Sequence, residues 1–168
     1  MPSLDPALIP QYVSINQNDV EMLARMLLAF ALGALLGFER ERAGRPAGLR
    51  TFMMVTAGSA AFTLVSIYGF LDQGTVRDPA RVAAQIVTGI GFLGAGTIWR
   101  TPSTVRGLTT AATIWFAAAV GMMVGSGLYL VATTSAVFGF ICLQFLRSPA
   151  RRASMRGEPS ITGQAREE

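Results

Sequence analysis

Charged side chains gather in one short segment of this chain, residues 37–51, which lies between two long apolar runs. A glutamate–arginine–glutamate triplet comes first, and the segment closes with Arg-Pro-Ala-Gly-Leu-Arg-Thr. Arginine guanidinium groups match the planar geometry of carboxylates and phosphates, so this segment could recognise an anion or form internal ion pairs. The candidate residues are Glu39, Arg40, Glu41, Arg45, Pro46, Gly48, Arg50 and Thr51, together with Arg106 and Gly107 from a similar segment further along.

Two interpretations of this arginine motif are open. Residues 48–51 and 107–110 are each expected to begin a helix, whose first N–H groups lack intrahelical partners and carry the positive end of the helix dipole. With arginines beside them, such helix ends suit a phosphate or carboxylate, from a lipid head group or a nucleotide. Alternatively, Glu39 and Glu41 occupy the arginines as internal salt bridges and fix the loop against the rest of the protein.

The sequence contains few residues that could support enzymatic catalysis. The chain has no histidine, its single cysteine, Cys142, lies in an apolar run, and no serine or aspartate stands in a recognisable nucleophile motif. Asp72 and Asp78 could contribute at most a weak and hydrated magnesium site. We therefore expect a protein that is not an enzyme and that has no cofactor or metal site.

The composition indicates an integral membrane protein. Hydrophobic residues make up 51% of the 168 residues and charged residues only 14%, against roughly 25% in a typical soluble domain. All 14 basic residues are arginines, and they fall in short segments between apolar runs instead of forming one solvated face. This distribution argues against nucleic acid as a partner and predicts that the bilayer surrounds the protein.

The arginine groups also predict how the elements that carry them are arranged. Short loops rich in arginine stay in the cytoplasm, and such groups follow the first, third and fifth apolar runs. We expect an all-α bundle of five transmembrane helices with the N-terminus outside and the C-terminus inside. The predicted spans are residues 20–38, 51–71, 82–99, 107–125 and 128–146, preceded by a periplasmic segment at 1–19 and followed by a flexible cytoplasmic tail at 147–168.

Part of the sequence recurs at a constant offset. Gly37 and Gly96 differ by 96 − 37 = 59 positions, and Gly48 and Gly107 differ by the same number. Both copies would consist of a helix, an arginine loop and a second helix beginning with Gly-Leu-x-Thr. This pattern is consistent with a parallel two-helix repeat, although matches by chance are common among such abundant residues.

Glycines spaced by four residues predict close contacts between helices, because small residues let helix backbones approach in a membrane. Two such ridges, Gly33/Gly37 and Ala117/Gly121/Gly125, are candidate seams for a homodimer. The third span contains Gly89, Gly91, Gly94 and Gly96. We expect this span to be the central, most enclosed helix, the alternative being a broken helix that lines a substrate path.

One charged residue lies inside an apolar span. Arg25 is about one turn into the first span, and Glu21 precedes it by four residues, so the two side chains can pair on one helix face. We expect Arg25 to extend towards the membrane surface and anchor the helix there.

With these motifs laid out, the chain resembles the MgtC/SapB family of bacterial inner-membrane proteins. The similarity rests on residues 33–41, 45–51, 89–98 and 105–112, and it extends over about residues 25–140. It implies a multi-pass inner-membrane protein, linked in some relatives to growth at low magnesium, survival inside macrophages and restraint of the F-type ATP synthase. Longer members carry a soluble cytoplasmic domain after the last span, whereas we expect this chain to be a short form, and some of the shorter relatives are tied instead to acid or general envelope stress.

Two functions remain in competition. The first is a regulatory membrane protein that adapts the cell to low magnesium, acid or intracellular stress by docking against another membrane complex. The second is a small ion or solute carrier that works as a homo-oligomer, with the third span lining the path.

Overall fold

The computed structural model describes residues 17–69 and 78–145, which form a bundle of helices and one short hairpin. The predicted periplasmic segment and cytoplasmic tail lie outside the described residues, apart from the start of the first helix. The elements are α2 (Gln17–Arg42), α3 (Leu49–Leu64), the π-helix η2 (Val65–Gly69), α4 (Pro79–Ala95), β1 (Trp99–Arg100), β2 (Val105–Arg106), α5 (Leu108–Gly125) and α6 (Tyr129–Phe145).

The prediction of an all-helical membrane fold is confirmed at this level. Three helical segments are long and apolar enough to cross a membrane: Asn18–Arg42, Leu49–Gly69 and Leu108–Gly125. Tyr129–Phe145 is a shorter apolar helix.

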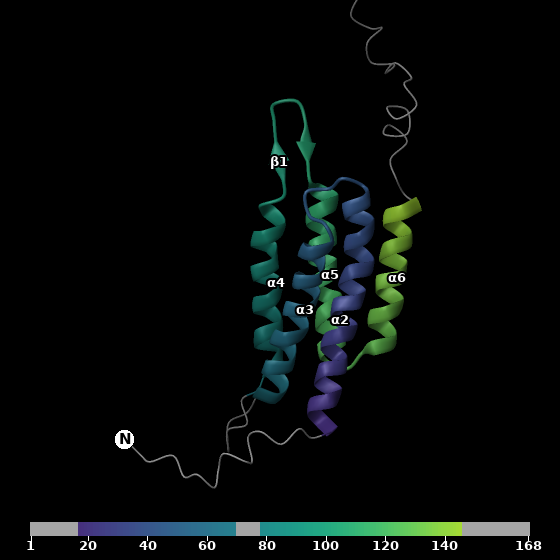
Figure 1. Ribbon diagram of the computed structural model, residues 1–168. Coiled ribbons are helices and arrows are strands. Elements are labelled where there is room, and N and C mark those ends of the chain that lie inside the picture. Colours follow the sequence, from purple (N-terminus) through teal and green to yellow (C-terminus); the bar gives the residue numbers. More distant parts are fainter. Residues whose placement is uncertain (1–16, 70–77, 146–168) are drawn as a thin grey trace, which may run out of the picture.

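Successive long helices run in opposite directions, so the ends of α2, α4 and α6 lie beside the beginnings of α3 and α5 (Figure 1). We call this the hairpin end of the bundle, because the strands β1 and β2 project from it. The arginine motif of residues 37–51 and the similar segment around Arg106 therefore meet at one end of the molecule.

The hairpin is a feature that the sequence analysis missed. Residues 96–99 were expected to continue the third span, but α4 ends at Ala95 and the chain turns into β1, which pairs antiparallel with β2. Hydrogen bonds between Thr101 and Thr104 close the turn. Gly107 then adopts φ 91°, and a Cβ atom there would lie 1.9 Å from the Thr97 carbonyl oxygen, so only glycine fits between the hairpin and α5.

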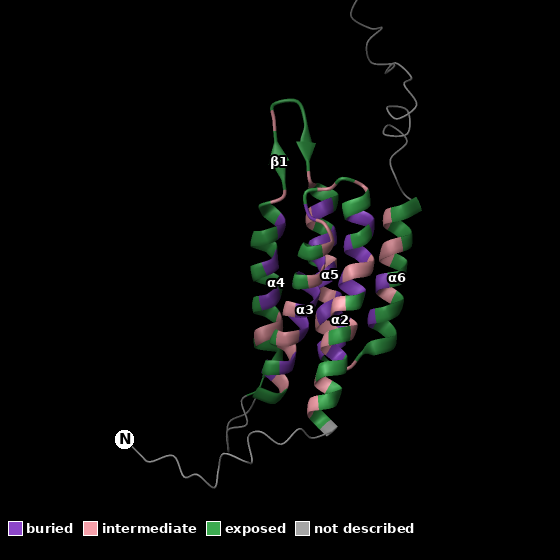
Figure 2. Ribbon diagram, in the orientation of Figure 1, coloured by how far each residue is buried: buried purple, intermediate pink, exposed green. Residues whose placement is uncertain are grey.

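The centre of the bundle is α5, and the expectation that the third span is the most enclosed helix is wrong for the described chain. Helix α5 packs against α2, α3, α4 and α6, and buried residues occur along its length from Thr110 to Gly125, whereas the outer helices show much green (Figure 2). In contrast, α4 buries only Ile86, Ile90 and Gly94, which lie on a single helix face. The glycines of α4 lie mostly on its open side, so a high glycine content does not mark the central helix.

Close helix contacts occur at the two glycine ridges of α2 and α5. A Cβ atom on Gly33 would lie 2.7 Å from the Phe52 carbonyl oxygen, and one on Gly121 would lie 2.1 Å from the Thr56 carbonyl oxygen. Gly37 and Gly125 meet α3 at similarly short range. Helix α3 therefore covers both ridges, and neither is open to a second copy of the chain, which contradicts the two predicted homodimer seams.

The glycines of α4 have looser surroundings. Nothing lies within 4 Å of a Cβ atom placed on Gly89 or Gly91, whereas Gly94 makes an ordinary contact with Ala111 at 3.6 Å. Gly96 caps the end of the helix. The first two glycines thus leave open space beside α4.

Candidate functional site

The site begins with a buried ion pair at the hairpin end of the bundle. Glu39 is 2% exposed and Arg40 is 3% exposed, and the Arg40 guanidinium donates to a Glu39 carboxylate oxygen through both Nε and Nη2. The remaining nitrogen, Nη1 of Arg40, is also buried and has no hydrogen-bond partner among the described residues. Two opposite charges thus sit inside the bundle at the last turn of α2.

Glu41 forms a hydrogen bond with the start of the next helix, α3. Its carboxylate accepts a hydrogen bond of 2.8 Å from the backbone N–H of Leu49, the first residue of α3. Gly48 contributes no side chain at the helix cap, and a Cβ atom there would lie 2.9 Å from the same carboxylate oxygen. An internal carboxylate therefore occupies the helix N-terminus at which the anion interpretation placed a ligand.

The tight loop between α2 and α3 makes this arrangement possible. Arg45 donates its backbone N–H to the Arg40 carbonyl at 3.0 Å, and Gly44 takes φ 63°, so the chain reverses immediately after the helix. Pro46 lies on the outer side of the loop, while Ala47 is buried beneath it. The reversal brings the glutamates of α2 back to the start of α3.

The remaining predicted residues lie nearer the surface. Arg50 and Thr51 are exposed on the first turn of α3, and Arg106 is exposed on β2 opposite Trp99. Helix α5 begins after Gly107 without a side-chain cap. The structure thus brings Glu39, Arg40 and Glu41 into the protein interior or onto a helix end and leaves Arg50 and Arg106 available at the surface.

A second charged cluster, at the opposite end of the bundle, was underestimated from the sequence. The predicted pairing of Arg25 with Glu21 is confirmed at 2.6 Å, but Arg25 is only 8% exposed and does not extend to the surface as an anchor. Its Nη1 donates to the Gly125 carbonyl oxygen at 2.8 Å, and its guanidinium lies 5.7 Å from the Tyr68 ring and 5.6 Å from the Tyr129 ring.

This cluster connects four elements. Glu21 also accepts a hydrogen bond of 2.9 Å from the Tyr129 hydroxyl, so α2, η2, α5 and α6 all meet at one guanidinium. The sequence carried a signal for it, since tyrosines stand at the expected ends of two other spans. Cation–π contacts are stronger where the cation is shielded from water. The burial of Arg25 therefore strengthens its contacts with the two tyrosine rings.

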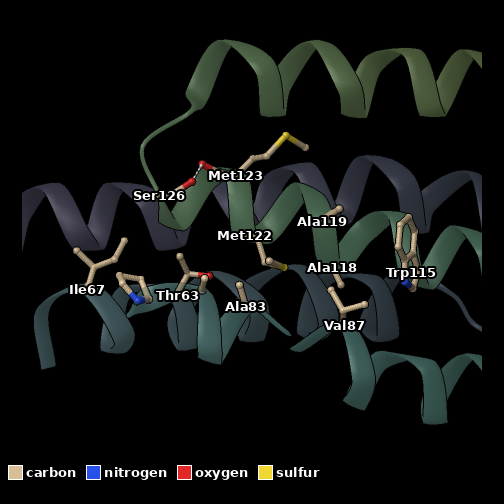
Figure 3. A pocket seen from close by; sticks show the side chains of 12 residues that line it. Thr63, Ile67, Ala83, Val87, Trp115, Ala118, Ala119, Met122, Met123 and Ser126 are labelled. Carbon is tan, nitrogen blue, oxygen red and sulfur yellow. Dashed lines mark hydrogen bonds between the residues drawn. The ribbon is translucent and has the colours of Figure 1, made fainter. Parts of the chain in front are cut away.

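Several apolar cavities open between the helices. One of about 450 Å³ lies among α3, α4 and α5, where Thr63, Val87, Trp115 and Met122 face one another (Figure 3). A second, of about 490 Å³, lies between α3 and α4. A third, of about 450 Å³, adjoins it at the hairpin end and is also lined by the loop before α3, by β1 and by Ile114 of α5. Within residues 17–69 and 78–145, no group of three His, Cys, Asp or Glu side chains is placed to hold a metal ion.

Comparisons of the sequence with known proteins identify relatives. A family model described as "MgtC family" matches residues 26–152. The chain is 44% identical over 128 residues to "Putative magnesium transporter YhiD" of Escherichia coli (strain K12), covering 74% of this chain and 60% of that protein. It is 52% identical over 110 residues to "Protein MgtC" of Brucella abortus (strain 2308), covering 66% of this chain and 44% of the relative.

A third relative has a more similar length. "Protein SrpB" of Synechococcus elongatus is 41% identical over 142 residues, which cover 79% of this chain and 78% of that protein. No solved structure is significantly similar to the chain. The matched region of the chain thus spans less than two thirds of YhiD and less than half of the Brucella protein.

Proposed function

Because the chain belongs to the MgtC family, we propose that it is a non-enzymatic, multi-pass protein of the bacterial inner membrane that acts by docking against other membrane proteins. The physiological setting is adaptation to low magnesium, in keeping with the name of the Escherichia coli relative, or to acid or intracellular stress. An inner-membrane complex such as the F-type ATP synthase is the partner that the family resemblance implies.

The proposal includes the five-span topology, with the N-terminus outside and the C-terminus inside. This topology is supported by four arginines that all lie at the hairpin end, namely Arg40, Arg50, Arg100 and Arg106. Arginine-rich loops stay in the cytoplasm, so this end faces inwards.

The observation that carries the docking proposal is the outer surface of α6. This helix buries only Ala132 and Ala136, while Leu130 is 81% exposed and Phe138 is 65% exposed. Leu130 and Phe138 differ by eight residues and therefore share one helix face. Since the glycine ridges are covered inside the chain, a partner helix would pack against such peripheral faces, and a homodimer would have to use them too.

A crosslinking experiment tests this proposal. A photo-crosslinking amino acid at Phe138 should give one discrete protein adduct in native membranes from magnesium-limited cells. The same amino acid at Val87, which faces a cavity on the far helix α4, is the matched control. Absence of a protein adduct from Phe138, in cells whose growth still depends on the protein, would contradict docking through α6.

Transport is the second candidate function, favoured by the name given to the Escherichia coli relative. Purified full-length protein in proteoliposomes separates the two proposals. Saturable magnesium flux that is absent from empty liposomes would replace docking by transport, whereas a stoichiometric membrane partner without flux supports docking.

A further inference from the structure

A continuous groove runs between α3 and α4 towards the hairpin end of the bundle. It consists of the two cavities of about 490 Å³ and 450 Å³, which share Val55 and Leu93 in their walls. The first is lined by side chains from the middle of both helices, and the second reaches Thr51, Thr97 and Trp99. We refer to both together as the α3–α4 groove.

Glycines on both helices keep this groove open. Gly58 of α3 and Gly89 of α4 line it, and nothing lies within 4 Å of a Cβ atom placed on either. Glycine in a helix is less favourable than alanine by about 1 kcal/mol, and here no protein atom demands it. The space is therefore available to a molecule other than this chain.

The apolar walls indicate what kind of molecule fits the middle of the groove. Met54, Phe62, Ile86 and Ile90 line it, and Gln85 is the one side chain there with a polar amide. In a membrane, such a surface takes up hydrocarbon. An α-helix is about 10 Å wide and would lie over a groove of this size instead of entering it.

Positive charge stands where the groove reaches the hairpin end. Arg50 adjoins Thr51, which lines the hairpin-end cavity, and it lies one turn before Met54, which lines the other cavity. Arg106 is paired directly across the hairpin with Trp99, so both side chains project from the same face of the hairpin, and Trp99 lines the groove. Both arginines are exposed.

We propose that the α3–α4 groove binds an anionic phospholipid. One acyl chain lies against Gly58 and Gly89, and the phosphate lies at the hairpin end between Arg50 and Arg106. Guanidinium groups suit phosphate oxygens, and Trp99 is a residue type enriched at membrane–water interfaces. This ligand explains why an apolar groove and two exposed arginines occur together, whatever partner the protein docks against.

Binding can be measured on the full-length protein in detergent by native mass spectrometry. Phosphatidylglycerol should remain bound to the protein with an apparent affinity about tenfold higher than phosphatidylcholine of the same chain length, because only the former carries a net negative charge. Inorganic phosphate should not change the unfolding temperature of the protein, because it cannot fill the apolar groove.

Four variants locate the site. Gly89→Leu fills the groove and should weaken phosphatidylglycerol binding about tenfold, whereas Gly91→Leu, which is equally open but is not in the wall of the α3–α4 groove, should bind as the unmodified chain does. Arg50→Gln and Arg106→Gln should each remove the preference for the anionic lipid. All four are surface changes, and circular dichroism checks their helix content.

Four results would overturn the proposal. Equal binding of the two lipids by the unmodified chain would remove the head-group site, and equal binding by Gly89→Leu and Gly91→Leu would remove the groove. A stabilisation by inorganic phosphate equal to that by phosphatidylglycerol would indicate a free-anion site. In native membranes, a disulfide-linked dimer formed through Gly89→Cys in a Cys142→Ala background would show that a second chain, and not a lipid, covers the groove.

Discussion

Glu39 and Arg40 place two opposite charges inside an apolar bundle, and their proximity makes this arrangement tolerable. Taking a charge out of water is costly unless a partner and further hydrogen bonds compensate for it. Adjacent positions on a helix do not normally face each other, but here both side chains leave the last turn of α2 and meet in the interior. The pair is thus a local solution to a burial problem that the tertiary structure creates.

The first prediction concerns this pair. Glu39→Gln leaves the Arg40 charge buried without its counter-charge and should lower the free energy of unfolding by about 3–5 kcal/mol. The double variant Glu39→Leu/Arg40→Met removes both charges and should be destabilised much less. Thermal unfolding in detergent measures both, and a double variant as unstable as Glu39→Gln would show that the charges stabilise the fold beyond compensating each other.

The second prediction concerns the cluster at the opposite end of the bundle. Arg25→Met removes the hydrogen bonds to Glu21 and to the Gly125 carbonyl and should destabilise the protein by about 1.5–3 kcal/mol. Arg81→Met, at an exposed position on α4, is the control and should have little effect. Equal unfolding temperatures for the two variants would mean that Arg25 makes no net contribution.

At the scale of elements, the seam between α3 and α5 determines how the bundle packs. Gly121 allows the two backbones to touch at Thr56, and this contact places α5 at the centre. The peripheral helices α4 and α6 are each buried along one face only. Close backbone approach, rather than the number of glycines in a helix, distinguishes the central helix from the outer ones.

The third prediction tests this distinction. Gly121→Ala forces a Cβ atom against the Thr56 carbonyl and should destabilise the protein by ~1–3 kcal/mol. Gly91→Ala, in open space on α4, should instead stabilise it by up to about 1 kcal/mol, because alanine favours the helix. Denaturation of both variants in the same detergent gives the comparison, and a stability loss of equal size in both would argue against the α3–α5 seam.

For the whole molecule, the antiparallel order of the helices brings the arginine segments together from positions far apart in the sequence. The fourth prediction follows from this order and from the positive-inside rule. Reporter fusions after Gly44 should report a cytoplasmic location, and fusions after Ser126 a periplasmic one. The reverse result at both sites would invert the proposed topology.

The sequence alone predicted the helical membrane class and the approximate ends of α2 and α5, because runs of apolar residues and flanking charges are local properties. It also predicted that Glu21 pairs with Arg25, since four residues separate them on one helix. It did not predict the β1–β2 hairpin, because two-residue strands carry almost no periodic signal. Nor did it distinguish glycines that touch a neighbour from glycines that face open space.

The candidate site was also predicted from the sequence only in part. Sequence determined which residue types lie in the arginine motif, and therefore which anions it could bind. Only the tertiary structure decided that Glu39 and Arg40 are buried together, that Glu41 caps α3, and that a groove between α3 and α4 reaches Thr51, next to Arg50. The physical reason is that composition and spacing act within one element, whereas burial, helix contacts and cavities depend on which faces of distant elements meet.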